Sequence, residues 1–236
     1  MDELPEVPDF PDFADLPEPA GPSPVVLLHG VGQMPTMWQS QVEALGAQTK
    51  AVAPWIDGLR PGRPREVSLP RAAAGLISSM ELNGIKRARV VAHHFGAMAA
   101  LQAAVDAPGR IERMVLSGVV ALPGRLTLAA QKAVVKLMPP ARLAEVGATK
   151  EDLLRALDVM AKADFMSRLG EITVPVLVIC CEADPVGRAY AQTLERDLPG
   201  AELTLISGSG PAPMAASPEE YNQAMTEFLN RAESAG

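Results

Sequence analysis

The chain of 236 residues contains only three histidines, and two of them, His93 and His94, are adjacent. They lie in the segment RVVAHHFGAMAAL at 89–101, where an apolar run is followed by small residues. This pattern predicts a strand, a tight turn and a helix, with His94 at the tip of the turn. Histidine tolerates the left-handed backbone of such a turn better than most residues. An imidazole held there can act as a general acid or base, so His94 is the first candidate catalytic residue.

The elements that must position His94 follow from hydrophobic patterning. Apolar runs rich in Val, Ile and Leu are continuous rather than alternating, which is typical of strands buried on both faces of a parallel sheet. Helical patterns lie between them, so the sequence predicts an α/β fold with a doubly wound, mostly parallel sheet. The expected strands are 24–29, 50–53, 88–92, 113–119, 174–180 and 202–206. The expected helices are 36–47, 69–83, 96–107, 187–198 and 218–232.

Two segments depart from this alternation. Residues 1–23 are rich in proline and acids and show no periodicity, so an extended N-terminal arm is expected before a single domain at 24–236. Residues 122–168 are predicted to be helical only, with Thr149 capping one helix. An all-helical insert between two strands would cover the carboxyl ends of the strands as a lid, where ligands of such sheets bind.

The composition excludes several classes of function. The net charge of −7 and a pI near 5.1 argue against nucleic-acid binding and against an anionic membrane surface. No apolar run reaches the roughly 18 residues of a membrane-spanning helix, and the acidic start is unlike a secretory signal, so a cytoplasmic location is expected. Cys180 and Cys181 are adjacent on an expected strand and are interpreted as small core residues. We expect no metal site.

Four segments together resemble the alpha/beta-hydrolase superfamily: VVLLHGVGQMPTMW at 25–38, VVAHHFG at 90–96, VPVLVICCEADPVG at 174–187 and the stretch 205–229. The resemblance covers about residues 24–232 and implies the hydrolase fold. It also implies an oxyanion hole, which binds negative charge developing on a substrate oxygen. Its donors would be the backbone amides of Val31 and Phe95, and His29 would have a structural role.

The resemblance breaks at the catalytic triad. The family's turn is normally Gly-x-Ser-x-Gly, whereas this chain has Ala92 at the first glycine and His94 at the serine. The triad acid matches Asp184, but Pro211 stands where the family carries its catalytic histidine. A seryl-enzyme mechanism needs a hydroxyl and an imidazole to deprotonate it. Ordinary ester hydrolysis by a Ser-His-Asp triad is therefore not expected.

One hypothesis accounts for these replacements together. The space opened by Pro211 would let His94 point at Asp184 and form a His–Asp dyad, in which the carboxylate raises the pKa of the imidazole. Such a dyad with an oxyanion hole suits proton transfer next to a carbonyl, as in an isomerase, cyclase or lyase. The expected substrate is a small apolar carbonyl compound in a mostly apolar pocket. No cofactor is expected.

Two alternatives stay open. The chain could be a catalytically silent pseudoenzyme that binds a small apolar ligand or a protein partner, because the replaced positions are also what relaxed selection would leave. It could also be a residual esterase-like hydrolase. Oligomeric state is not predicted. The candidate pocket-lining residues, of which Met34 and Trp38 are favoured as packing residues, are Gly30, Gly32, Met34, Trp38, His93 and Pro211.

Overall fold

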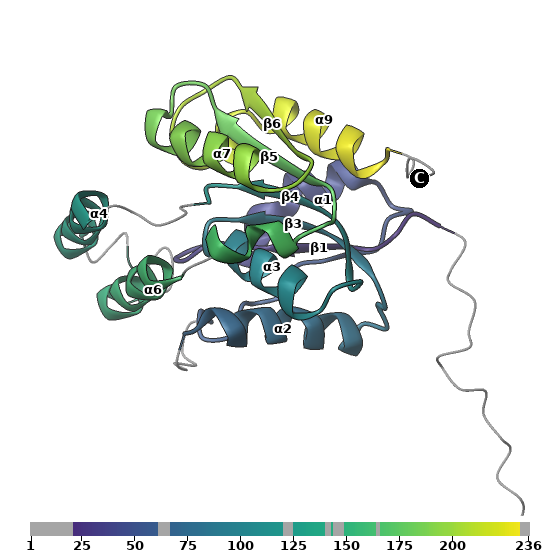
Figure 1. The fold of residues 1–236 in the computed structure, drawn as a ribbon, viewed down its shortest axis with the longest axis horizontal. Helices are drawn as coiled ribbons and strands as arrows, with labels where there is room; N and C mark the ends of the chain where they lie inside the picture. The colour runs from purple at the N-terminus through teal and green to yellow at the C-terminus, as the bar shows by residue number, and fades with distance from the viewer. Residues whose placement is uncertain are drawn as a thin grey trace, which may run out of the picture.

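A computed structural model describes residues 21–60, 67–119, 125–139, 143, 149–163 and 166–231. Its centre is one six-stranded sheet with the strand order β2-β1-β3-β4-β5-β6, in which every pairing is parallel (Figure 1). The predicted α/β class and parallel sheet are confirmed, and each expected strand is present with its ends shifted by a few residues. The strands are β1 (Val25–Leu28), β2 (Ala51–Val52), β3 (Ala88–His93), β4 (Ile111–Ser117), β5 (Val176–Cys181) and β6 (Ala201–Ile206).

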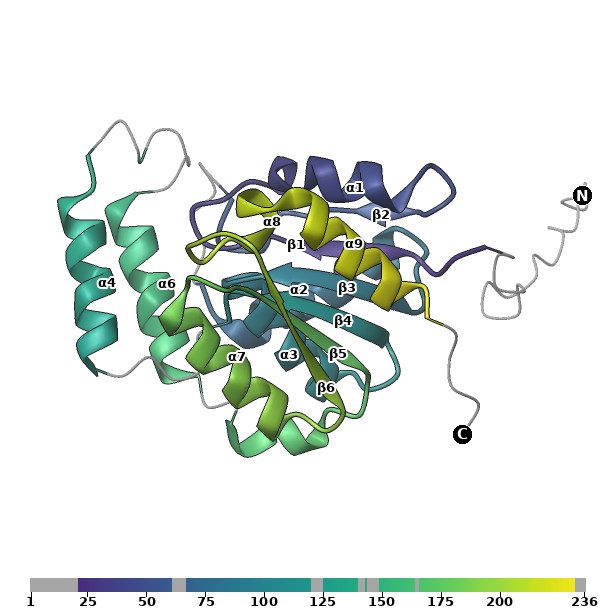
Figure 2. The ribbon, with the colours of Figure 1, turned by 90° about the horizontal axis from the view of Figure 1, so that it is seen from above.

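Helices cover both faces of the sheet and give the molecule three layers. One hydrophobic cluster joins the sheet to α2, α3 and α7, and a second joins it to α1, α8 and α9. Figure 2 shows α1, α8 and α9 together above the strands. The flanking helices are α1 (Gln39–Leu45), α2 (Leu69–Leu82), α3 (Phe95–Asp106), α7 (Pro185–Asp197), α8 (Pro213–Ala216) and α9 (Pro218–Leu229), with the 3-10 turns η2 (Pro35–Trp38) and η3 (Met166–Glu171).

Helix α3 packs close to the sheet because its second residue is a glycine, Gly96. A Cβ on Gly96 would lie 2.5 Å from the carbonyl oxygen of Leu28 and 2.6 Å from that of His29. Such a contact is sterically excluded, so only glycine lets α3 approach β1 to this distance. The retained second glycine of the turn therefore fixes the position of the helix that follows His94.

Two further helices, α4 (Arg125–Leu137) and α6 (Lys150–Lys162), lie between β4 and β5 in the chain. They pack side by side beyond one end of the sheet (Figures 1 and 2). Thr149 caps α6 with a reciprocal capping box to Asp152, which confirms the predicted cap. The pair forms its own apolar cluster around Val135 and Leu153, and Val31 packs against that cluster from the sheet side. Val31 thus links the two helices to the carboxyl end of β1.

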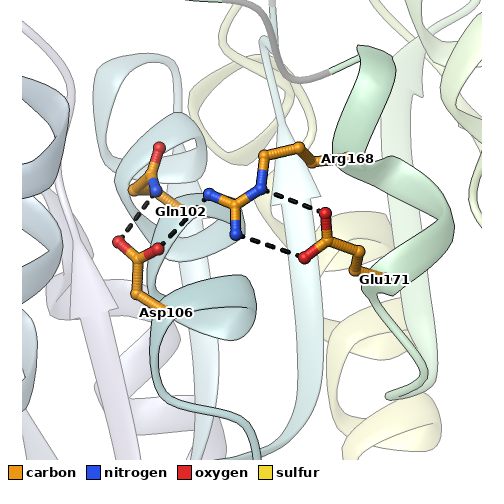
Figure 3. Close-up of polar contacts among 4 residues, drawn as sticks. All are labelled: Gln102, Asp106, Arg168 and Glu171. Atoms are coloured by element: carbon orange, nitrogen blue, oxygen red, sulfur yellow. Dashed lines mark hydrogen bonds and ion pairs between the residues drawn. The ribbon is translucent and has the colours of Figure 1, made fainter.

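The turn η3, which leads from this insert back to β5, is attached to α3 by an exposed polar cluster (Figure 3). The guanidinium of Arg168 contacts Asp106 at 3.4 Å and donates two hydrogen bonds to the carboxylate of Glu171. Gln102 donates a 2.8 Å hydrogen bond to Asp106. Ion pairs this exposed contribute little to the stability of a fold, so the cluster mainly fixes where η3 lies.

At the other end of the sheet, Arg89 is a buried cation without a carboxylate partner among the described residues. Its side chain, 4% exposed, donates hydrogen bonds to the carbonyl of Ser23, the carbonyl of Leu229 and the side chain of Asn230. The last carbonyls of α9 carry the negative end of the helix dipole and have no partner within the helix. Arg89 therefore joins the segment that enters β1 to the end of α9.

None of the helices in the described ranges is both long and apolar enough to cross a lipid bilayer.

Candidate active site

The turn between β3 and α3 holds His94 in a strained backbone conformation. His94 has φ 53° and ψ −117°, and among the described residues it alone combines a side chain with a positive φ. This region of backbone space strongly favours glycine, and a non-glycine residue there costs about 1–3 kcal/mol. Strain of this kind persists where the surrounding structure requires one side-chain position. The predicted sharp turn is therefore confirmed, with His94 at its tip.

Two neighbours hold this turn in place. The His94 amide donates a 2.9 Å hydrogen bond to the carbonyl of Ser117 at the end of β4. On the opposite side, a Cβ on Gly30 would lie 2.9 Å from the Cβ of His94. The turn is thus fixed between the loops that follow β4 and β1.

The backbone amides of Val31 and Phe95 were predicted to be the donors of an oxyanion hole. Phe95 is the first residue of α3, whose leading N–H groups have no acceptor within the helix. Neither amide donates a hydrogen bond to any group of the described chain. The preceding amide, that of Gly30, is occupied because it donates to Gln33 Oε1 at 2.8 Å. Two unpaired donors therefore flank the imidazole that the sequence singles out.

A cavity of about 380 Å³ opens at this end of the sheet. Six of its twelve lining residues carry a polar side chain, so the lining is mixed rather than purely aliphatic. Gln131 comes from α4, which places one helix of the insert in the cavity wall, as expected of a lid. The lining residues are Val31, Gln33, His93, His94, Gly118, Val119, Gln131, Asp184, Val186, Gly187, Tyr190 and Pro211.

The structure does not show the direct contact predicted between His94 and Asp184. Both side chains line the cavity, but no hydrogen bond or ion pair joins them in the described part of the molecule. The expected rise in the pKa of His94 is wrong: burial lowers it to about 4. The reason is that desolvation disfavours the charged imidazolium and no carboxylate is close enough to offset it. His94 is therefore a neutral imidazole at pH 7.

Asp184 has a structural contact of its own. It caps α7, with Oδ1 accepting a 2.9 Å hydrogen bond from the amide of Gly187. Pro185 follows at the first helical position, which suits such a start. The other carboxylate oxygen has no donor within the described chain, and Asp184 makes no ion pair there. A carboxylate without a cation consequently lines the cavity.

His93 lines the cavity as well, as expected of a candidate pocket-lining residue. It is 3% exposed, its Nδ1 lies 3.1 Å from Ser117 Oγ, and its ring centroid lies 6.0 Å from that of His94. Burial, together with the neighbouring His94, lowers the pKa of His93 to about 3. Two neutral imidazoles therefore lie side by side in one wall.

His29 has the structural role that the resemblance implied. Its Nδ1 lies 2.8 Å from the carbonyl of Gly30, and its Nε2 accepts a hydrogen bond from the amide of Ile56 at 3.2 Å. Burial lowers its pKa, so it too is neutral. Both ring nitrogens are occupied by backbone groups, which leaves none for catalysis.

Of the six candidate pocket-lining residues, His93 and Pro211 line the cavity and the other four do not. Trp38 is fully buried in the core between the sheet and α9, where its indole N–H has no partner in the described structure. Met34 is exposed, and Gly30 packs against the Cβ of His94. Gly32 has a positive φ of 70° in the same loop.

Three polar lining residues, Gln33, Gln131 and Tyr190, were not identified from the sequence. Gln33 comes from the loop after β1, Gln131 from α4 and Tyr190 from α7. Only Gln33 offered a signal, because it lies two residues after the oxyanion donor Val31. No group of three or more histidine, cysteine or acidic side chains suited to a metal ion occurs in the described ranges.

Comparison with known proteins finds relatives of this chain by sequence. The model of the alpha/beta hydrolase family matches residues 25–224. A protein named carbamate hydrolase RutD from Klebsiella pneumoniae is 26% identical over 254 residues, covering 90% of this chain and 94% of the relative. The corresponding protein of Caulobacter vibrioides is also 26% identical and covers 90% of this chain and 92% of its own.

Solved structures agree on the fold. A bromoperoxidase from Bacillus anthracis superposes with a TM-score of 0.76 at 21% identity, covering 89% of this chain and 92% of its own. The enol-lactonase of Burkholderia xenovorans superposes with a TM-score of 0.73 at 18% identity, covering 91% of this chain and 94% of its own. The match of the family model over most of the chain, together with the parallel sheet and the strained turn after β3, shows that this chain belongs to the alpha/beta hydrolase family.

Proposed function

We propose that this protein is an atypical enzyme of the family, in which the neutral imidazole of His94 is the general base for proton transfer next to the carbonyl of a small substrate. The observation that carries this proposal is the position of His94 at the strained tip of the turn, in a cavity wall and beside two free amides. No seryl intermediate is involved, since the turn has no hydroxyl and Pro211 replaces the usual imidazole.

The chemistry follows from these groups. The substrate carbonyl oxygen binds between the amides of Val31 and Phe95. A C–H bond on the neighbouring carbon breaks, its proton passes to His94 and the electron pair moves to the oxygen, forming an enolate. Losing one donor to such an oxyanion commonly costs about 10²–10³ in rate. Negative charge on the enolate also favours the imidazolium, so the pKa of His94 rises as the proton is transferred.

Asp184 does not orient His94 by direct contact in this proposal. Because no hydrogen bond joins it to His94, orientation of the imidazole by this carboxylate requires a bridging water. The cavity of about 380 Å³ has room for such a water beside a small substrate.

Isotope exchange tests the proposal without knowledge of the natural substrate. The protein is incubated in D₂O with a panel of small ketones, keto amides and lactones, and loss of α-proton signals is followed by NMR. We expect accelerated exchange for a subset of compounds and its loss in His94→Gln and His94→Ala. Unchanged exchange in both variants would overturn the role of His94.

The names of the curated relatives favour a second candidate, hydrolysis without a seryl intermediate. His94 would take a proton from water, and the hydroxide would attack the carbonyl of a carbamate or lactone held in the same oxyanion hole. Release of product in H₂¹⁸O with label in one product, lost in His94→Gln, would favour this reaction over enolisation. Binding of compounds without exchange or hydrolysis would instead identify a catalytically silent binding protein.

A further inference from the structure

We infer that the substrate carries an N–H or O–H donor near its carbonyl, and that His93 Nε2 accepts this hydrogen bond in a cavity that also presents the carboxylate of Asp184. The inference rests on the proposed function, because it names the substrate class for the same site. It assigns His93 a specificity role that the family's reaction does not require of this position.

The hydrogen bonds behind His93 determine which of its nitrogens carries the proton. The hydroxyl of Ser117 donates toward the carbonyl of Ala92 at 3.5 Å. Its oxygen lies 3.1 Å from His93 Nδ1, and we assign the hydrogen of that contact to Nδ1, which then donates to Ser117. With the proton on Nδ1, a neutral imidazole keeps a bare lone pair on Nε2. His93 is thus an acceptor toward anything that reaches Nε2.

Nε2 is reached from the cavity. It makes no hydrogen bond to any residue that the structure describes. It is also not one of the polar side-chain atoms that are sealed from solvent without a partner, which are Trp38 Nε1, Gln41 Oε1 and Tyr221 OH. The ring as a whole is 97% buried, and the cavity is the open space that it lines. A buried, unpaired acceptor facing a cavity gains most from a ligand that donates to it.

The ring of His93 is packed closely on one side by Gly118. A Cβ on Gly118 would lie 2.6 Å from His93 Cε1 and 2.9 Å from Nδ1, so the backbone of Gly118 closes off that edge of the ring. Gly118 has a φ of 60°, which suits glycine at this tight approach. His93 is therefore preorganised, and a ligand need not order it.

The charge of the cavity points to the same class of ligand. The described lining contains no lysine or arginine, and its one formal charge is the carboxylate of Asp184, which has a single protein donor, the amide of Gly187. An anionic ligand would be repelled by this carboxylate and would find no cation, whereas an N–H or O–H donor finds two acceptors. Neutral amides, carbamates, ureas and hydroxy ketones fit, and simple esters and carboxylates do not.

A matched set of probes measures this preference by NMR titration of the full chain. Benzamide, methyl benzoate and benzoate share one ring, but only the first is a neutral donor. We expect benzamide to bind at least about tenfold more tightly than methyl benzoate, and benzoate most weakly. In His93→Phe, which keeps a ring but removes both nitrogens, the ratio should fall to about one while the affinity for methyl benzoate stays within about twofold. A ratio unchanged by this variant, or tightest binding of benzoate, would refute the inference.

Nitrogen-15 NMR of the imidazoles provides a second readout that needs no variant. The His93 signals at pH 7 should show a protonated Nδ1 and a bare Nε2, and Ser117→Ala should shift the balance between the two tautomers. A protonated Nε2 in the unsubstituted protein would refute the inference even if His93→Phe failed to fold. His94→Gln distinguishes this inference from the proposed function, because it should abolish turnover but keep the preference for benzamide. Turnover that persists in this variant would contradict the proposed function alone.

Discussion

His94 and Gly30 approach each other so closely that a Cβ on Gly30 would lie 2.9 Å from the Cβ of His94. The two residues follow the neighbouring parallel strands β3 and β1, so this contact joins the histidine turn to the loop after β1. The free amides of Val31 and Phe95 are the next residues along each loop. Their relative position therefore depends on the absence of a side chain at Gly30.

Gly30→Ala should consequently damage the site more than the fold. The added methyl would also lie 2.5 Å from Gln33 Oε1, a flexible group that can move, whereas the Cβ of His94 is fixed to the backbone of the turn. We expect a loss of about 1–3 kcal/mol in the free energy of unfolding and at least a tenfold loss of α-proton exchange. The matched control is Gly170→Ala, where a Cβ meets no atom within 4 Å. Equal behaviour of the two variants would contradict the steric account.

Relief of backbone strain at His94 gives a second prediction. At φ 53° and ψ −117°, glycine avoids the strain that alanine retains. His94→Gly should therefore be roughly 1 kcal/mol more stable than His94→Ala, despite the greater flexibility of glycine in the unfolded chain. Urea unfolding of both variants measures the difference, and both should lack exchange activity. A less stable glycine variant would mean that the turn is unstrained.

Stability should fall with acidification because the histidines are buried in their neutral form. The folded pKa of His93 is about 3 and that of His94 about 4, against about 6.5 in the unfolded chain. Between these limits the unfolded chain binds protons that the folded chain does not, so the free energy of unfolding declines as the pH falls from about 6.5. For His93 alone, the loss between pH 8 and pH 4.5 is roughly 2–3 kcal/mol. Urea unfolding at the two pH values measures it.

The control for this prediction is His93→Phe, which cannot titrate. Its pH dependence over the same interval should be smaller than that of the unsubstituted protein by about the contribution of His93. If the two proteins lost the same stability, the carboxylates rather than the imidazole would control acid unfolding.

A gain-of-function variant tests whether the hydrolase framework is intact. His94→Ser combined with Pro211→His restores a serine at the turn and an imidazole at a second residue of the cavity wall, beside Asp184. We expect labelling by a fluorophosphonate probe and hydrolysis of p-nitrophenyl acetate at least tenfold above background, neither of which the unsubstituted protein should show. The single variant His94→Ser is the control, because it lacks a base. Labelling of the unsubstituted protein would reveal a nucleophile elsewhere.

The sheet was predictable because each strand is a continuous apolar run. Val25 to Leu28 and Val176 to Cys181 are buried along their whole length, so no face has to alternate with solvent. Helix ends were less predictable: α9 stops at Leu229 rather than at 232. The predictions for residues 1–20, for the parts 122–124, 140–142, 144–148 and 164–165 of the insert, and for residue 232 lie outside the described residues.

The site was predictable in part. His94 and Asp184 follow strands that the sequence marks, so their presence at one end of the sheet could be inferred. Their separation could not, since it depends on how far the α7 cap holds the carboxylate from the turn. The predicted rise in the pKa of His94 was wrong for the same reason. Burial lowers this pKa and pairing with a carboxylate raises it, so the direction depends on the distance to Asp184.

The hydrogen bonds of Arg89 affect the order in which parts of the chain can fold during synthesis. This residue lies in β3, yet one of its acceptors is the carbonyl of Leu229, 140 positions further along the chain. A ribosome therefore releases β3 well before the groups that neutralise the cost of burying its guanidinium. During synthesis, the strand that ends at His93 can complete its packing only after α9 has emerged.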